Sequence, residues 1–335
     1  MGLLQFTTAI LLALLLGGLA VSVLLRLGKL PRLHGLVARW RPLQAAPAPA
    51  GCRELLIVVT EPGQHLVRFA SVGGAAAAKA ALLRLCARLR VSDAEISDIR
   101  SGTHRAAQPA IGGVLHGPPG CGKTLLARAL AGELNLPLYA ISGVDLDQLP
   151  PAAWAAPLRA LFATAAERAP SLIFIDNLDS LKTASPKLAA TAAAGCAGPP
   201  GVLQLVSLLD ELSRQQAGVV VLGAARRLEG VHEALVRPER LGRAIALALP
   251  EPRERAEIIA LLARSHPTLD NLDVLALAAR TDGYSGADLG ALLARLARLV
   301  AERPESPAGP PSIEPAELDR ALAEAPPPAR PPTSR

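Results

Sequence analysis

Eight consecutive residues constrain this chain more than any others: residues 117–124 read GPPGCGKT. They fit the phosphate-binding pattern G-x-x-x-x-G-K-[ST] at every fixed position. Residues 111–116, just before them, are apolar and flanked by glycine, as in a buried strand, and residues 125–134 have the composition of a helix. A chance Gly/Pro turn would not be expected between such a strand and such a helix. The stretch therefore predicts a nucleotide site in an α/β fold.

The pattern assigns a role to each of its residues. The glycines let backbone N–H groups close around phosphate oxygens, and the N-terminus of the following helix adds its positive dipole end. Lys123 is expected to reach the outer phosphates, and Thr124 to ligate magnesium. The residues predicted to contact the nucleotide are Gly117, Pro118, Pro119, Gly120, Cys121, Gly122, Lys123 and Thr124.

A second candidate follows the apolar run LIFID, residues 172–176. A buried strand that ends in a carboxylate places that group at the edge of a parallel sheet where nucleotides bind. We therefore predict that Asp176 is the second residue facing the magnesium ion, beside Thr124. An aspartate that merely caps a turn is the alternative interpretation.

Composition argues against several other classes of protein. The chain has 335 residues, a formal net charge of +6 and only 2% aromatic residues, and its arginines are scattered. A nucleic-acid-binding surface needs a block of basic residues, so we expect no nucleic-acid partner. The four cysteines, at positions 52, 86, 121 and 196, contain no C-x-x-C pair, so neither a zinc site nor a disulfide framework is indicated.

The N-terminus predicts a membrane anchor. No charged side chain occurs between Leu3 and Leu25, and a helix of about 23 residues is ~34 Å long, enough for a hydrocarbon core of ~30 Å. A cleaved signal peptide is the alternative, but no basic residue precedes the run. Basic residues follow it at Arg26, Lys29, Arg32, Arg39 and Arg41. The positive-inside rule then places the rest of the chain on the cytosolic side of a single-pass membrane protein.

Apolar periodicity and Pro-rich breaks divide the remaining chain. Strands are expected at 54–60, 111–116, 172–176 and 218–222, and helices at 74–90, 125–134, 158–168, 202–214, 253–264, 274–280, 287–302 and 314–325. Strands that alternate with helices predict a parallel sheet flanked by helices, followed by a small helical lobe. The predicted domains are an anchor (1–27), a Pro/Ala-rich tether (28–52), a large α/β subdomain (53–250), a helical lid (251–325) and a disordered tail (326–335).

From about residue 65 to residue 325 the chain resembles the AAA family of P-loop ATPases. The resemblance rests on LVRFASVGGAAAAKAAL, GPPGCGKT, LIFIDNLDS, LQLVSLLDEL, LVRPERLGR and TDGYSGADL, which occur in the family's order. It implies the AAA+ fold with a C-terminal lid, ATP and Mg²⁺ as ligands, and a ring, usually of six identical or paralogous subunits. It also implies that Arg240 and Arg243 reach the neighbouring subunit's site, and that Gly286 and Ala287 face the nucleotide from the lid.

Three segments depart from the family's pattern. The family has a glutamate after the strand-end aspartate to polarise water, whereas this chain has Asn177. Because an amide cannot accept a proton, hydrolysis should be slow, and Asp179 is expected to point elsewhere. Arg226 stands where the family has an asparagine that positions water.

The third departure lies in the expected substrate-gripping pore loop. An aromatic residue followed by an aliphatic residue and glycine is expected there, but the spacing gives Pro150 and Pro151. Trp154 is near enough to replace the aromatic residue if the loop is rearranged, and packing in the core is the alternative.

Two hypotheses follow from these residues. The first is a membrane-anchored AAA ATPase that extracts or remodels membrane proteins. Its layout resembles that of membrane-anchored AAA translocases. We expect it in an organelle membrane (mitochondrial outer, peroxisomal or endoplasmic reticulum) rather than in the plasma membrane. The metalloprotease branch is set aside because His232-Glu233 lacks the second histidine of H-E-x-x-H. The second hypothesis is a subunit that hydrolyses ATP poorly and lends Arg240 and Arg243 to an active partner in a mixed ring.

Overall fold

The structure is a computed structural model that describes residues 55–87, 111–182, 199–302, 313 and 315–324. All of them lie in the unit Cys52–Arg335. The predicted anchor between Leu3 and Leu25, the tether and the tail at 326–335 lie outside the described residues. Within the described ranges, no helix is both long enough and apolar enough to cross a membrane.

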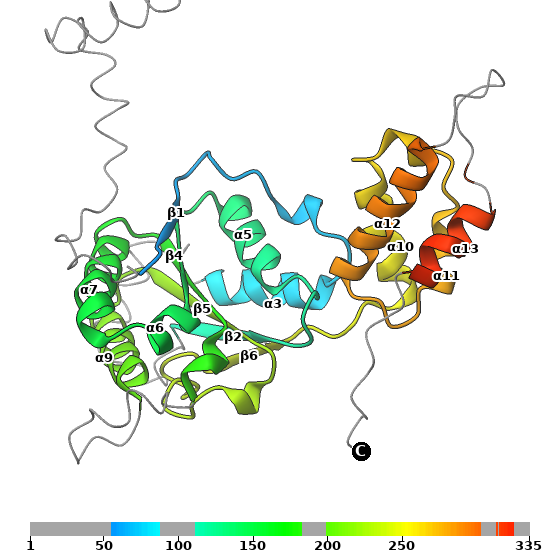
Figure 1. Ribbon diagram of the computed structural model, residues 1–335. Helices are drawn as coiled ribbons and strands as arrows, with labels where there is room; N and C mark the ends of the chain where they lie inside the picture. Colours follow the sequence, from blue (N-terminus) through cyan, green and yellow to red (C-terminus); the bar gives the residue numbers. More distant parts are fainter. Residues whose placement is uncertain (1–54, 88–110, 183–198, 303–312, 314, 325–335) are drawn as a thin grey trace, which may run out of the picture. The chain divides into compact units, whose positions relative to one another are not determined.

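A six-stranded sheet forms the centre of the large subdomain (Figure 1). Its strands follow the order β1-β3-β4-β5-β2-β6. Their bounds are β1 Val58–Thr60, β2 Gly112–His116, β3 Leu138–Ser142, β4 Ser171–Asp176, β5 Val219–Ala225 and β6 Arg243–Ala246. The strand before the phosphate loop, β2, thus lies between β5 and β6, with β4 one strand further away.

The sheet is mixed rather than parallel throughout. Strands β2, β3, β4, β5 and β6 pair in parallel, as predicted, but β1 runs antiparallel to β3. The prediction of a purely parallel sheet is therefore wrong for β1. This strand has only three residues and lies at the edge of the sheet with most of its side chains exposed, a position where an antiparallel strand is common.

Helices cover both faces of the sheet (Figure 1). On one face, α7 (Pro151–Glu167) and α9 (Pro200–Gln215) pack against Ile173 and Ile175 of β4. On the other face, α3 (Ala76–Cys86) and α5 (Lys123–Leu134) pack against Leu172 and Phe174. Side chains alternate between the two faces of a strand, so β4 contributes to both cores and is buried along nearly its whole length.

Four helices form the lid and share a core of their own. They are α10 (Pro252–Ala263), α11 (Val274–Arg280), α12 (Gly286–Ala301) and α13 (Pro315–Glu324). Arg255 of α10 is only 3% exposed, and its guanidinium donates to the carbonyl oxygens of Ala278 and Pro250, both at 3.0 Å. This buried arginine therefore fixes α10 to α11 and to the chain that enters the lid.

The predicted helices are present, and most of their ends lie within about two residues of the prediction. However, α7 begins at Pro151 rather than at residue 158, and residues 88–90 of the predicted helix 74–90 lie outside the described residues. Two strands were missed. No strand was predicted at β3 or at β6, which have five and four residues. The short helical segments η1 (Phe69–Ser71), α6 (Gly143–Gln148), η3 (Leu178–Lys182), η4 (Leu228–Gly230) and η5 (Pro267–Leu269) connect the main elements.

Candidate nucleotide-binding site

The loop of residues 117–124 lies between β2 and the start of α5, as the sequence predicts. The Gly117 N–H donates to the Ala225 carbonyl oxygen at 3.3 Å, which fixes the loop to the end of β5. Gly117 has a φ of +151°, and a Cβ there would lie 1.9 Å from the Leu247 carbonyl oxygen. Only glycine fits this position, because a backbone atom occupies the space that a side chain would need.

Lys123 is the first residue of α5, and its ammonium group turns back over the loop. It donates to the carbonyl oxygens of Gly117 and Pro118, each at 2.8 Å. Partial burial lowers the pKa of Lys123, and the nearby positive charge of Arg226 lowers it further, whereas Cys121, Asp176 and Asp179 raise it. Charged groups at the end of β4, in η3 and just after β5 therefore all act on the pKa of this ammonium group.

Thr124 and Asp176 are brought together across 52 positions of sequence. The Thr124 hydroxyl donates to Asp176 Oδ2 at 2.8 Å, and the backbone N–H of Asn177 donates to Oδ1 at 2.9 Å. Hydroxyl and carboxylate oxygens are the ligands that Mg²⁺ prefers, so the pair fits the predicted magnesium site. A magnesium ion bound there would neutralise part of the charge on bound phosphates.

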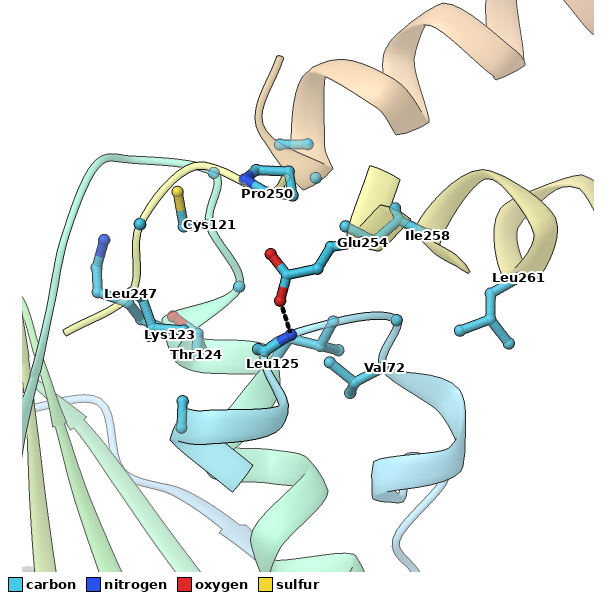
Figure 2. Close-up of a pocket in the computed structure, with 18 of the residues that line it drawn as sticks. Val72, Cys121, Lys123, Thr124, Leu125, Leu247, Pro250, Glu254, Ile258 and Leu261 are labelled. Carbon is cyan, nitrogen blue, oxygen red and sulfur yellow. Dashed lines mark hydrogen bonds between the residues drawn. The ribbon is translucent and has the colours of Figure 1, made fainter. Parts of the chain in front are cut away.

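A cavity of about 600 Å³ opens beside the loop, a size typical of small-molecule sites. Four parts of the chain line it: residues 71–78, the phosphate loop with the start of α5, residues 246–250, and the lid. In Figure 2, Lys123 and Thr124 lie on one side, and Ile258 and Leu261 of the lid lie on the other. The cavity has apolar walls with a phosphate-binding end, as expected for a base and its phosphates.

The lid is tied to the large subdomain at this cavity by side chains that sequence analysis did not single out. Glu254 of α10 accepts a hydrogen bond from the Ala75 N–H at 2.8 Å, drawn dashed in Figure 2, and Glu257 accepts one from the Gly74 N–H at 3.0 Å. Glu254 also completes a capping box with Glu251 at the start of α10. That capping pattern, an acidic residue three positions after the cap, is visible in the sequence, but its contact with residues 74 and 75 is not.

Gly286 and Ala287 lie at the start of α12, beside the phosphate loop, and that they face the nucleotide stays a prediction. The Ala287 N–H donates to the Gly120 carbonyl oxygen at 3.2 Å. Ser285 caps the helix in a capping box with Asp288, and a Cβ on Gly120 would lie 2.3 Å from the Ser285 hydroxyl oxygen. The loop and the lid therefore approach closely only because position 120 is glycine.

Cys121 lines the same cavity and is partly buried. Burial raises the pKa of its thiol, and the nearby Asp288 raises it further, whereas Lys123 lowers it. The thiol is therefore less reactive at neutral pH than an exposed cysteine, because the thiolate is the reactive form. The prediction that Cys121 contacts the nucleotide stays a prediction.

Asn177 and Arg226 follow β4 and β5, which are neighbours in the sheet. Asn177 is exposed and has a φ of +51°, and Arg226 is exposed as well. We expected Asp179 to point away from the strand ends, and this prediction is wrong. The 3₁₀ turn η3 returns residue 179 toward the ends of β4 and β5. Its carboxylate accepts a hydrogen bond from the Arg226 N–H at 3.0 Å.

Arg240 and Arg243, the two arginines expected to reach a neighbouring subunit's site, differ sharply in their surroundings. Arg240 is 8% exposed; its Nε and Nη2 donate to the two oxygens of Asp210, at 2.6 and 2.8 Å, and its Nη1 donates to the Ala234 carbonyl oxygen at 2.5 Å. These hydrogen bonds to Asp210 raise the pKa of Arg240. Arg243 begins β6 and is exposed. The structure therefore holds Arg240 within its own subunit, whereas Arg243 is accessible at the surface.

The expected pore loop is replaced by the start of a helix. Pro150 is the N-cap of α7 and Pro151 its first residue, and both are exposed. Trp154 is 1% exposed and belongs to the core, and its Nε1 donates to the Leu149 carbonyl oxygen at 3.0 Å. Of the two interpretations of Trp154, packing is the one that the structure supports.

Comparisons with known proteins agree with this geometry. Residues 114–249 match the family described as "ATPase family associated with various cellular activities (AAA)". The ATP-dependent zinc metalloprotease FtsH 2 of Salinibacter ruber is 41% identical over 190 residues, which are 56% of this chain and 27% of that protein. FtsH 2 of Symbiobacterium thermophilum is 35% identical over 263 residues, which are 78% of this chain and 42% of that protein.

The chain thus spans less than half the length of these relatives. Their names place them in the metalloprotease branch that the missing second histidine led us to set aside, and the resemblance to translocases has no counterpart among them. Among the described residues, no group of three or more His, Cys, Asp or Glu side chains could hold a metal ion. What the matches and the geometry share is the nucleotide-binding part: residues 114–249, which match the AAA family, contain the phosphate loop and the strand that ends at Asp176.

Proposed function

We propose that this chain binds Mg-ATP at the loop of residues 117–124 and turns it over slowly, so that bound ATP mainly controls the conformation and assembly of the protein. The observation that carries this proposal is the combination of a complete Thr124–Asp176 pair with an amide, Asn177, at the next position. Binding and hydrolysis depend on different side chains, and only the binding set is complete.

The residues of the site divide the work as follows. Backbone N–H groups of the loop bind the phosphates, and Lys123 compensates their outer charge. Thr124 and Asp176 hold the magnesium ion, and residues 71–78 together with the lid enclose the base. Because Ala287 and Glu254 contact the large subdomain at the rim of the cavity, nucleotide binding and the position of the lid should depend on each other.

Slow turnover follows from the groups that face the terminal phosphate. Asn177 cannot accept a proton from water, and losing a general base typically lowers a rate by about 10² to 10⁴. Asp179 has one oxygen engaged by the Arg226 N–H, so it is a poor replacement. Arg226 is a cation where a water-positioning amide would be expected.

A second candidate function is a motor that extracts or remodels membrane proteins. It is favoured by the apolar run between Leu3 and Leu25 and by the named relatives, which are ATP-dependent proteases. In this proposal the chain is anchored in an organelle membrane, its ATPase part faces the cytosol, and identical or paralogous subunits form a ring of six. Arg243 would then enter the neighbouring site, and a protein substrate would be pulled without help from Trp154.

The deciding experiment measures ATP binding and ATP turnover on the full chain, purified in a mild detergent, with three variants. Lys123→Ala should abolish tight binding, because it removes the cation that faces the outer phosphates. Asn177→Glu should bind ATP as the unmodified chain does and raise turnover by about 10² to 10⁴. Asn271→Glu, which adds a carboxylate at an exposed position of the lid, is the matched control and should change neither quantity.

Each outcome separates the proposals. If the unmodified chain binds ATP and only Asn177→Glu hydrolyses it, the slow-turnover proposal stands. If the unmodified chain already turns over ATP in a Lys123-dependent way, the motor proposal stands and the role given to position 177 is wrong. Absence of ATP binding would overturn both.

A further inference from the structure

Helix α3 begins without a capping group of its own. Its N-cap is Ala75, which has no side-chain oxygen to offer, and its first turn contains no acidic residue. A helix N-terminus has N–H groups without partners in the helix and a positive dipole end. The lid supplies the missing acceptors: Glu254 accepts from the Ala75 N–H at 2.8 Å, and Glu257 accepts from the Gly74 N–H at 3.0 Å.

Both carboxylates come from one face of α10. Glu254 and Glu257 are three residues apart, a spacing that places their side chains about one turn from each other on the same side of a helix. The Glu254 carboxylate also accepts from the Glu251 N–H at 3.1 Å. Figure 2 shows Glu254 reaching from α10 to the turn before α3. Bonds on both sides therefore make this carboxylate a fixed acceptor rather than a mobile surface charge.

The turn of residues 73–75 is shaped for the lid helix. A Cβ on Gly73 would lie 2.7 Å from the Ile258 backbone nitrogen, and one on Gly74 would lie 2.9 Å from the Glu254 Cβ. Ala75 has a φ of +54°, a left-handed conformation that residues other than glycine adopt only where their surroundings impose it. Two glycines thus let α10 approach the turn, and the bond from Ala75 to Glu254 holds the turn in place.

The same contacts form one wall of the cavity beside the phosphate loop. Gly73 and Ala75 line the cavity from the turn, and Glu254 and Ile258 line it from α10. The two hydrogen bonds therefore join the two parts of the chain that make up this wall. If they break, the lid helix is free to move away from the turn and the cavity opens on that side.

We propose that Glu254 and Glu257 are positioning residues that clasp the lid onto the N-terminus of α3 and thereby set how long a nucleotide stays in the cavity. This inference rests on the proposed nucleotide site and adds a means of retention to it. Hydrogen bonds to a carboxylate are about twice as strong as neutral ones, and a wall that is already ordered binds a ligand better than one that the ligand must order.

The clasp acts mainly on dissociation. A nucleotide enclosed by the turn and the lid leaves when the lid moves away, and that movement must break the bonds to both Gly74 and Ala75. Differences in affinity between variants of one site are also generally differences in dissociation rate. A long residence time suits a chain in which hydrolysis is slow, because release rather than cleavage then ends the bound state.

The test uses the double variant Glu254→Gln/Glu257→Gln of the full chain in detergent, with magnesium and an ADP analogue that carries a fluorescent group on the ribose. Glutamine keeps the shape of the side chain and is accepted in a capping box, but its bonds to the turn are neutral and weaker. We expect the dissociation rate, measured by a chase with unlabelled ADP, to rise roughly 10-fold. The association rate should change less than about threefold.

A matched control and a second measurement separate the clasp from general damage to the lid. Glu251→Gln changes a carboxylate that accepts from the backbone of its own helix, and it should release the analogue as the unmodified chain does. Without nucleotide, hydrogen exchange at residues 73–78 should be faster in the double variant than in Glu251→Gln, because only the double variant weakens the bonds to the turn.

The outcomes distinguish this inference from the proposed function. If exchange at the turn is unchanged, the two glutamates do not clasp the lid. If exchange is faster but the analogue leaves at the original rate, or if Glu251→Gln releases it as fast as the double variant, the role in retention is wrong although the nucleotide site stands. If the unmodified chain does not bind the analogue, the proposed function itself fails, and the role in retention fails with it.

Discussion

This molecule has the groups expected to bind a nucleotide, and other side chains hold them in place. The groups expected to act on water, on a substrate or on a neighbouring subunit are instead replaced, engaged in other contacts or buried. Each binding group is supported by a specific contact: Thr124 by Asp176, Gly117 by Ala225. In the second set, position 177 has an amide in place of a carboxylate, Arg240 is hydrogen-bonded to Asp210, and Trp154 is buried in the core.

This difference shows that a phosphate loop and a catalytic apparatus can vary independently on one sheet. The loop depends on backbone geometry that only a few residues satisfy, so its sequence is tightly constrained. The groups expected to act in catalysis are single side chains at strand and helix ends, where a substitution changes the chemistry without disturbing the fold. Four predictions test this contrast, taken from the largest expected effect to the smallest.

The largest effect is expected for Trp154→Ala. Removing a buried tryptophan leaves a cavity in the core, and such changes cost about 3 to 5 kcal/mol of folding free energy. Chemical denaturation of the full chain should show this loss, and the properly folded fraction should bind ATP with unchanged affinity. Leu66→Ala, at a side chain that is 97% exposed, is the control and should have little effect. If Trp154→Ala has normal stability but fails to move a protein substrate, Trp154 would instead be a substrate-gripping residue.

Gly117→Ala should weaken ATP binding at least about 100-fold, or ~2.7 kcal/mol. The added methyl group would overlap the Leu247 carbonyl oxygen, so the loop must move away from the phosphates. Gly63→Ala is the matched control: it too has a positive φ, of +82°, but nothing lies within 4 Å of the added Cβ. Equal ATP affinities for both variants, measured by titration, would show that the loop tolerates displacement and that the contrast is overstated.

Asp176→Asn should remove most of the effect of magnesium on ATP affinity. Loss of a hydrogen-bonding charged ligand corresponds to roughly a 10- to 100-fold change. Titrations with magnesium and with a chelator give the magnesium-dependent part directly. Asp270→Asn, at an exposed lid residue, should leave that part unchanged. A full magnesium effect in Asp176→Asn would mean that another carboxylate holds the ion.

The smallest effect is expected for Asp210→Asn, which weakens the bidentate pair with Arg240. Because the side chain of Asp210 is 40% exposed and that of Arg240 is 10% exposed, the loss should be about 1 kcal/mol, well below that of a fully buried pair. Denaturant titration measures it, and Glu211→Gln, on the exposed side of the same helix, is the control. Unchanged stability would show that Arg240 is free to serve a neighbouring subunit after all.

The sequence by itself determined the phosphate loop, the Asp176 position and most helices. These features depend on local patterns: glycines at fixed spacing, an apolar run that ends in a carboxylate, and periodicity that spans ten or more residues. The strands β3 and β6 were missed because neither shows a strong apolar run of its own: only one of the four residues of β6 is buried, and β3 is held by β1 and β4 on its two sides. The orientation of β1 was wrong because its direction is set by pairing with β3, not by its own residues.

Only the tertiary structure decided what the long polar side chains do. Nothing local indicates that Asp210 binds Arg240, 30 positions later, that Glu257 reaches Gly74, or that Asp179 returns to Arg226. A charged side chain takes the partner that the packing of distant elements brings within reach, and that partner fixes whether it is free to act. The sequence therefore specified the groups available for binding, and the packing of the sheet, the helices and the lid determined which of them are engaged.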